Sequence, residues 1–137
     1  MGDDREYRTE AVTLEKFINQ LACHYIKNEY FFYVTGRIPD GKVPGVIDWK
    51  LVEKYGIAIS KYQRHRRKQQ RIRRANLQYL RHGRFFCLLA SEGKHRFFSE
   101  EADIRDCRKC PLKYGGYSVV YHSGHVSVRL DQRAYRE

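Results

Sequence analysis

The strongest constraint on the fold is a pair of alternating segments joined by a two-residue turn. Residues 117–122 (YSVVYH) and 125–130 (HVSVRL) flank Ser123-Gly124, a pattern typical of a tight β-hairpin. Strand alternation predicts a core face made of Tyr117, Val119, Tyr121, Val126, Val128 and Leu130. The more polar face carries Ser118, His122, His125, Ser127 and Arg129. We therefore expect antiparallel pairing in the C-terminal part of the chain.

Two helices are predicted in the first part of the chain. Thr13 can cap a helix that ends near Lys27, because apolar residues recur there at helical spacing. Asp48 can cap a second, short helix, and Gly56 can end it.

Three further strands are predicted, at residues 30–38, 84–90 and 95–99, where aromatic and aliphatic residues cluster. The charged residues 100–116 are expected to form a loop. The fold should be α+β: a mostly antiparallel sheet of about five strands, with the N-terminal helix and a basic helix packed on one face.

The length of 137 residues fits one domain. We expect residues 1–12 to be a flexible leader and residues 13–137 to form a single nucleic-acid-binding domain. The last residues, 134–137, look like the opening of a helix, as a truncated chain would show.

The charge balance restricts the partners. The chain has 27 Lys and Arg against 16 Asp and Glu, a formal net charge of +11. Such a surplus attracts polyanions, of which nucleic acid is the commonest large one, and an acidic protein is another option. A membrane partner would require a basic helix with a broad apolar face, or an apolar run of about 20 residues. The sequence has neither pattern and no secretory signal, so we expect a cytoplasmic protein without a membrane partner.

The most basic part of the chain runs from Lys61 to Arg84, with ten Lys or Arg and no acidic residue. Arg and Gln favour helix, so a helix over about residues 60–79 is predicted. Its only apolar line consists of Tyr62, Ile72, Ala75 and Tyr79. Four basic residues should share one face outside the core: Arg64, Arg67, Lys68 and Arg71.

Phosphate contact is the function that this segment predicts. The planar Arg guanidinium matches phosphate oxygens, and neutralising phosphates releases condensed counterions. Aromatic and His side chains among the arginines could stack on exposed bases, which favours RNA or single strands. The alternative is a solvated helix face, but such faces usually mix charges of both signs. The predicted contact residues are Lys61, Tyr62, Arg64, His65, Arg66, Arg67, Lys68, Arg71, Arg73, Arg74, Tyr79, Arg81 and Arg84.

Cys107 and Cys110 have the spacing of half a zinc site. The neighbouring cations that would stabilise thiolates are Arg105, Arg108 and Lys109. Other ligands could come only from Cys23 or His24, with His122 or His125. Cys87 falls in an apolar strand and is expected in the core. Half a motif is poor support for a metal site, so we expect reduced thiols, no metal and no cofactor.

The hairpin histidines, His122 and His125, are secondary candidates together with Arg129 on the same face. As cross-strand neighbours they could hold a metal or a phosphate, or act as general acid and base. The favoured alternative is two solvent-facing histidines at a hairpin tip.

Carboxylates offer little support for an enzyme. Glu92-Gly93-Lys94, with Asp40, bears a faint similarity to a metal-dependent nuclease site. The acidic stretch at residues 100–106 is expected to balance the basic helix. Enzymatic activity is left open, with binding favoured.

Two resemblances accompany these patterns. Gly116-Tyr117-Ser118-Val119-Val120-Tyr121 and Arg133-Ala134-Tyr135 are similar to the RelE/ParE toxin family. That resemblance implies a small basic protein of a kind that can cut messenger RNA without metal, using Arg, Lys, His and Tyr to stabilise phosphate charge. The segments FFYVTGRIP, NLQYLRHGRFF and GGYSVVYHSGHVSVRL resemble an uncharacterised family of bacterial hypothetical proteins across residues 30–135. This second resemblance implies no function.

The sequence therefore predicts a protein that binds RNA or DNA through its basic helix. The alternatives are a RelE-like ribonuclease and an accessory subunit that docks on a ribonucleoprotein or a mobile-element complex. The oligomeric state is left open.

Overall fold

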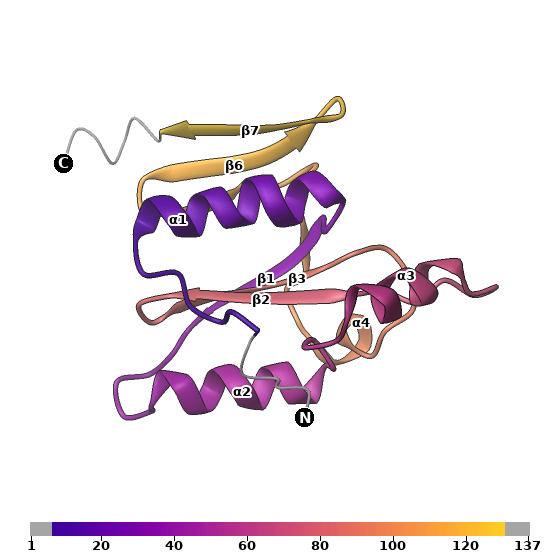
Figure 1. The fold of residues 1–137 in the computed structure, drawn as a ribbon. Helices are drawn as coiled ribbons and strands as arrows, with labels where there is room; N and C mark the ends of the chain where they lie inside the picture. Colours follow the sequence, from indigo (N-terminus) through magenta and orange to yellow (C-terminus); the bar gives the residue numbers. More distant parts are fainter. Residues whose placement is uncertain (1–6, 131–137) are drawn as a thin grey trace.

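The computed structural model describes residues 7–130 and contains two antiparallel sheets, with strand orders β2-β3-β1-β4 and β5-β6-β7 (Figure 1). The strands are β1 (Phe32–Arg37), β2 (Leu77–His82), β3 (Phe85–Ala90), β4 (Arg105–Asp106), β5 (Leu112–Tyr114), β6 (Tyr117–His122) and β7 (His125–Leu130). The helices are α1 (Leu14–Asn19), α2 (Pro44–Lys54), α3 (Lys61–Gln69) and α4 (Phe97–Glu100). The α+β class is confirmed, with the strands divided between two sheets. The predicted helix opening at residues 134–137 lies outside the described residues.

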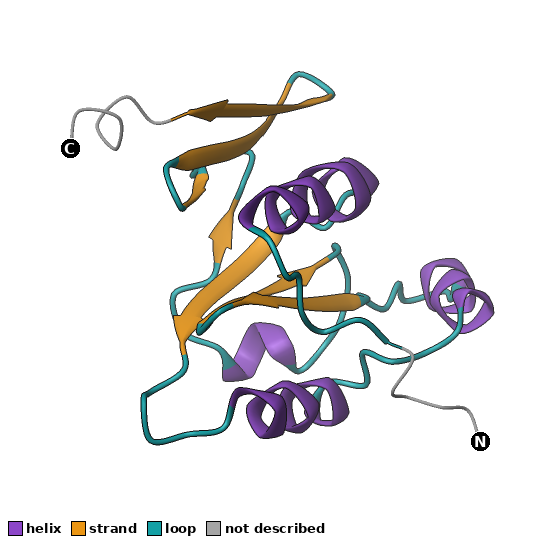
Figure 2. Ribbon diagram, turned by 60° about the vertical axis from the view of Figure 1, so that its left-hand side comes forward, coloured by secondary structure: helices purple, strands orange, loops and turns teal. Residues whose placement is uncertain are grey.

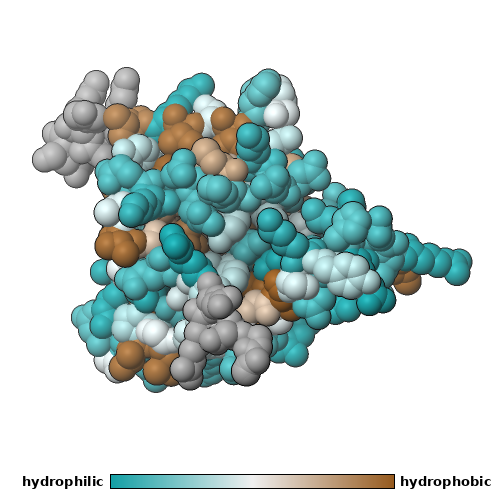
Figure 3. All heavy atoms as spheres, in the orientation of Figure 1, coloured by the Kyte–Doolittle hydropathy of each residue, from teal (hydrophilic) through white to brown (hydrophobic). Residues whose placement is uncertain are grey.

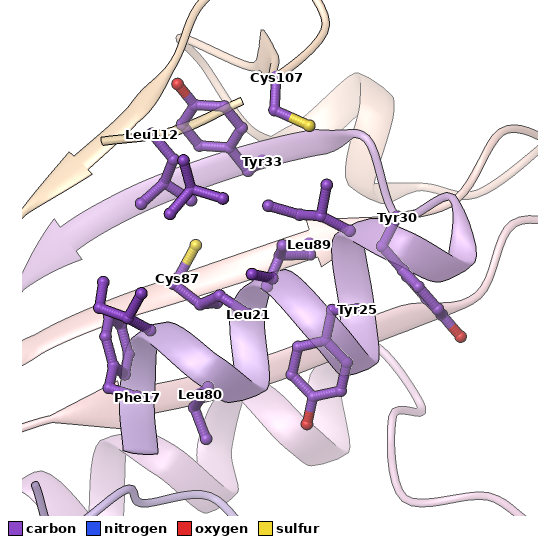
Figure 4. Close-up of a cluster of buried hydrophobic side chains, with 14 of the residues drawn as sticks. Phe17, Leu21, Tyr25, Tyr30, Tyr33, Leu80, Cys87, Leu89, Cys107 and Leu112 are labelled. Carbon is purple, nitrogen blue, oxygen red and sulfur yellow. The ribbon is translucent and has the colours of Figure 1, made fainter. Parts of the chain in front are cut away.

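The N-terminal helix joins the two sheets. Thr13 caps α1 by accepting a hydrogen bond from the Lys16 amide at 3.1 Å. The chain continues through a π-helical turn and a 3₁₀ turn to Asn28, close to the predicted end. Figures 1 and 2 place this helix between the hairpin and the four-stranded sheet. Its buried side chains, including Phe17 and Leu21, meet Leu80 and Cys87 of the large sheet and Leu112 of the small one (Figure 4).

Helices lie on both faces of the four-stranded sheet, whereas the sequence predicted one helical face. Strand β3 explains the difference, because its side chains are buried on both sides. Cys87 and Leu89 join the core beneath α1, while Leu88 and Ala90 join a second core beneath α2 and α4. A continuous apolar run such as this one is typical of a strand covered on two faces.

A buried ion pair connects α2 to β2. Asp48, predicted as a helix cap, lies inside α2 and is 1% exposed. Arg81 donates to it from Nε at 2.8 Å and from Nη2 at 2.9 Å, and the Tyr79 hydroxyl donates to the same carboxylate. Burial and the adjacent carboxylate raise the pKa of Tyr79. Both partners of Asp48 are therefore core residues.

Part of the predicted leader is paired with β2. The Ala11 amide donates to the Arg81 carbonyl at 2.8 Å, and the Arg81 amide donates to the Thr9 carbonyl at 2.8 Å. Further back, the Tyr7 hydroxyl donates to the Gln78 side chain at 2.7 Å. Residues 1–6 lie outside the described part of the chain.

The predicted helix over residues 60–79 is wrong beyond Gln69. Residues 77–82 form β2 instead, and they bury Leu77, Tyr79 and Leu80 against β3 and the two cores. That burial outweighs the helix propensity of Arg and Gln. Tyr79 and Arg81, which the sequence assigned to the nucleic-acid surface, are 0% and 7% exposed and cannot contact a ligand there.

The predicted strand at residues 95–99 is also wrong, because α4 occupies most of it. The His95 Nδ1 accepts a hydrogen bond from the Phe97 amide at 3.0 Å, which fixes the entry to α4. Phe97 is then fully buried, and Phe98 packs edge-on against Phe32.

The predicted hairpin is confirmed. Ser123 and Gly124 both have positive φ, at 50° and 81°, and β6 pairs with β7 in the expected register. Val119 is fully buried, but Val128 and Leu130 are 43% and 51% exposed. The expectation that they belong to the core is therefore wrong, because α1 covers only part of the hairpin's apolar face.

The Asp48–Arg81 pair generates the first prediction. Asp48→Asn keeps the shape of the side chain but removes the buried charge that Arg81 pairs with. Among the described residues, Arg81 then keeps the exposed Glu10 at 3.5 Å and the Gly83 carbonyl at 2.7 Å. The free energy of unfolding, measured with urea, should fall by about 3–5 kcal/mol, as for a broken buried pair. The matched control is Glu100→Gln, which removes exposed pairs to Lys54 and Arg96 and should cost less than about 1 kcal/mol. Equal effects of the two substitutions would show that the buried Asp48 pair contributes no more to the free energy of unfolding than the exposed pairs do.

Candidate nucleic-acid interface

Helix α3 projects from the edge of the fold where β2 begins (Figure 1). The Ser60 hydroxyl accepts from the Gln63 amide at 3.1 Å, and the Gln63 side chain accepts from the Ser60 amide at 3.0 Å. This reciprocal cap starts the helix at the predicted place. Helix α3 has no buried residue, so the local cap and a few tethers hold it.

Arg64 is the main tether of α3 to the fold. Its guanidinium donates to the Leu77 carbonyl at 3.1 Å, to the Ile57 carbonyl at 2.5 Å and to the Tyr30 hydroxyl at 3.3 Å. Arg64 lies outside the core, as expected, but it differs from the exposed Lys68 and Arg71 because the fold supplies hydrogen-bond acceptors for it.

We call the segment Lys61–Arg74 the basic ridge. It holds eight Lys or Arg and no Asp or Glu. Apart from Arg64 and Arg67, its Lys and Arg side chains are exposed, as are Tyr62 and His65. Within residues 7–130, no ion pair joins the ridge to a carboxylate. Figure 3 shows the hydrophilic projection that α3 and the following loop make on the right of the molecule.

A cleft of about 770 Å³ lies beside the ridge, and we call it the Arg67 cleft. Its walls come from three segments: the end of α2, the ridge, and the residues before α4. The cationic side chains lining it are Lys54, Arg67, Arg74, Lys94 and Arg96. Burial, together with the neighbouring Arg74 and Arg64, lowers the pKa of Arg67.

Backbone pairing brings two of these cations together. The Lys94 amide donates to the Arg73 carbonyl at 2.8 Å, and the Ala75 amide donates to the Lys94 carbonyl at 2.9 Å. Gly93 permits this approach, since a Cβ there would lie 2.7 Å from the Ala75 nitrogen, and its φ is +142°. Arg74 and Lys94 are consequently held as neighbours on the cleft wall.

A smaller hollow of about 470 Å³ lies on the other flank of α3. Lys61, His65 and Lys68 line it from the ridge, and His24 and Lys27 line it from the N-terminal helix. Glu29 is the one acidic residue in this lining. Basic hollows therefore flank α3 on both sides.

The remaining predicted residues do not join this surface. Arg84 lies beyond the opposite end of β2, where it donates to the carbonyls of Pro39 at 2.6 Å and Lys42 at 3.1 Å. His122 and His125 face each other across the hairpin turn of the small sheet, and both are exposed, as is Arg129. Asp40 and Glu92 follow opposite ends of the β1–β3 pair, so they form no nuclease-like carboxylate pair.

Of the two paired cysteines, Cys107 has surroundings that oppose thiolate formation. Cys107 is fully buried, and burial raises the pKa of its thiol to about 12. Arg108, expected to stabilise a thiolate, instead pairs with Asp106 at 2.8 Å, while Arg105 donates to the Cys110 Sγ at 3.6 Å. Within residues 7–130, no cluster of three or more His, Cys, Asp or Glu has metal-binding geometry.

Sequence reasoning missed the contribution of residues 94–96 to the basic surface. Lys94, His95 and Arg96 stand about twenty positions after the ridge, and only the sheet pairing of residues 73–75 brings them beside it. The short basic tripeptide itself carries no signal that identifies its partner.

Comparison with protein-family models, with curated proteins and with solved structures gives no match to this chain. No helix within residues 7–130 has the length and apolar character to span a membrane.

The division of roles along α3 can be tested by stability. Arg64→Ala removes three hydrogen bonds from a charged donor and should lower the free energy of unfolding by about 1.5–3 kcal/mol. Lys68→Ala, one turn further along the exposed side, should change it by less than about 0.5 kcal/mol. Urea denaturation of both variants distinguishes them. Equal decreases would mean that α3 as a whole, rather than Arg64, carries the attachment.

His95 predicts a pH dependence. Its Nδ1 accepts from the Phe97 amide and its Nε2 lies 3.1 Å from the Tyr55 carbonyl, an arrangement that requires the neutral ring. Burial, with smaller effects from Arg67, Arg74 and Arg96, lowers its pKa below the ordinary 6.5. The stability that His95 contributes should be complete above pH 6.5 and lost as the pH falls through the folded-state pKa.

Nuclear magnetic resonance of the His95 ring should give an apparent pKa below 6.5. The stability difference between the native protein and His95→Asn should also shrink as the pH is lowered from 7 towards 5. A His95 pKa above 6.5, or a difference that grows on acidification, would contradict the assigned neutral ring.

Proposed function

We propose that this protein binds nucleic acid through the basic ridge, with RNA or another single strand as the favoured ligand. The observation that carries the proposal is the concentration of eight cations without a carboxylate, and without an ion pair to any other described residue. Like charges held together in this way repel one another, and a polyanion relieves that repulsion.

The acidic stretch at residues 100–106 does not neutralise the ridge. Glu100 pairs with Lys54 and Arg96, the Tyr55 hydroxyl donates to Glu101, and Asp106 pairs with Arg108. These carboxylates therefore pair with residues outside the basic ridge, which contradicts the expectation that they balance the basic helix. The positive field of the ridge is left directed at solvent.

Exposed flat or apolar side chains on the ridge favour an unpaired strand. Tyr62 is 68% exposed with the Arg66 guanidinium 5.8 Å from its ring centroid, and Ile72 is 62% exposed. Unpaired bases can stack on such a Tyr–Arg platform, whereas the bases of a duplex are stacked on one another. A cytoplasmic location is part of the same proposal. Docking on a larger ribonucleoprotein is an alternative to it, because an accessory subunit of that kind would bind free nucleic acid only weakly.

The test is a matched pair of triple variants that remove the same charge. Arg66, Lys68 and Arg71 are changed to Ala in one, and the exposed Lys42, Lys50 and Lys113 in the other. In the ridge variant, affinity for single-stranded RNA, measured by fluorescence anisotropy, should fall. The slope of log affinity against log salt should flatten by about 0.7–0.9 for each phosphate that the variant no longer neutralises.

The control variant should bind nearly as tightly as the native protein, and both variants should keep their stability within about 0.5 kcal/mol. Equal decreases in affinity would assign binding to net charge rather than to the ridge. Absence of salt-sensitive binding to single-stranded RNA, single-stranded DNA and duplex DNA would overturn the proposal. Cleavage of the RNA probe would instead favour the RelE-like alternative.

A further inference from the structure

Arg67 differs from every other ridge cation in its surroundings. It is half-buried and lines the Arg67 cleft, and its Nη1 atom is buried without a hydrogen-bond partner. A buried guanidinium nitrogen without an acceptor is unfavourable, and other cations nearby add to the cost. Arg64, three positions earlier, has carbonyl acceptors for its own guanidinium, so the fold can satisfy such a group at this helix.

Cations dominate the lining of the cleft around Arg67, and Glu53 is the one carboxylate in it. Arg74 and Lys94 line it without an ion pair among the described residues, while Lys54 and Arg96 are held back by Glu100. Arg67 Nη2 lies 3.7 Å from the position that a Cβ of Gly56 would occupy, so the guanidinium rests against the end of α2. The volume of about 770 Å³ is within the range of small-ligand sites.

We propose that the Arg67 cleft binds a phosphate group of a single-stranded nucleic acid, with Arg67 as its main donor and Arg74 and Lys94 as flanking cations. This inference rests on the proposed function and adds a defined phosphate position to it. A phosphate in the cleft would accept hydrogen bonds from the exposed part of the guanidinium, and Nη1 would have to turn toward the cleft to donate as well. Exposed Ile72 on the cleft wall offers an apolar surface for the adjoining base.

The phosphate could be an internal phosphodiester or a terminal monophosphate, since both present the same anionic oxygens. Oligonucleotides of one sequence, with and without a 5′-phosphate, distinguish these sources. Inorganic phosphate alone serves as the third probe, and the ring resonances of His95, which lines the same cleft, report its occupancy.

The test compares Arg67→Gln with Arg66→Gln, its neighbour on α3, which is exposed and does not line the cleft. Arg67→Gln should weaken binding of the oligonucleotide by at least about tenfold, as expected when a charge-assisted hydrogen bond is removed, and Arg66→Gln by less than about threefold. Arg67→Lys, which keeps the charge but not the planar fork, should lie between them. Inorganic phosphate should shift the His95 resonances in the native protein and in Arg66→Gln, but not in Arg67→Gln.

Arg67→Gln should unfold at the same or a higher temperature than the native protein, because it removes an unpartnered buried donor. If it fails to fold, Arg67→Lys and the phosphate titration of the native protein carry the test. Equal oligonucleotide binding by the two Gln variants would overturn the cleft site and leave the ridge proposal standing. A phosphate response at His95 without any oligonucleotide binding would overturn both proposals as stated, and would indicate a site for free phosphate.

Discussion

The buried pair between Asp48 and Arg81 is the interaction on which the rest of this structure depends. It connects the middle of α2 to β2 across 33 positions of sequence, and Tyr79 completes it from the same strand. The backbone of Arg81 also receives the N-terminal segment through Thr9 and Ala11. One residue therefore joins α2, β2 and the start of the chain. Because β2 is fixed in this way, the basic chain before it must leave the sheet at Asn76 and extend outward.

The basic ridge carries a high positive charge and makes few contacts with the rest of the fold. A helix of nine residues without a buried side chain is marginal on its own. The cap at Ser60 and the acceptors around Arg64 supply its attachment. Arginines one turn apart thus have opposite situations, since Arg64 is satisfied by the fold and Arg67 is not. Such a contrast separates an arginine that stabilises the structure from one whose Nη1 has no acceptor within it.

The sequence was sufficient wherever local pattern decided the structure. The hairpin with its Ser123-Gly124 turn, the Thr13-capped helix and the strands around Val34 and Leu88 follow from alternation, capping and composition. Prediction from the sequence failed where residues distant in the chain determine the structure. Tyr79 and Arg81 are examples, because composition assigned both to a solvent-facing helix.

The Arg67 cleft could not have been predicted for the same reason. It is assembled from three segments, around residues 53–56, 67–74 and 94–96, and only sheet pairing makes them neighbours. A charge pattern identifies which stretch of chain is basic. It does not show which of its arginines will find hydrogen-bond acceptors within the fold, because those acceptors lie elsewhere in the sequence.

The helix between the two sheets has a mechanical consequence. Within the described chain, no strand of β5-β6-β7 pairs with a strand of the larger sheet. The two sheets are joined by side chains of the N-terminal helix and by direct contacts, such as the stacked rings of Phe85 and Tyr114. The hairpin can therefore open without breaking a rung of the larger sheet, as a separate cooperative unit of lower stability. The ridge is attached to the larger sheet at β2. Local melting of the C-terminal hairpin would thus leave the basic ridge attached to β2, and sequence variation in the hairpin would not alter that attachment.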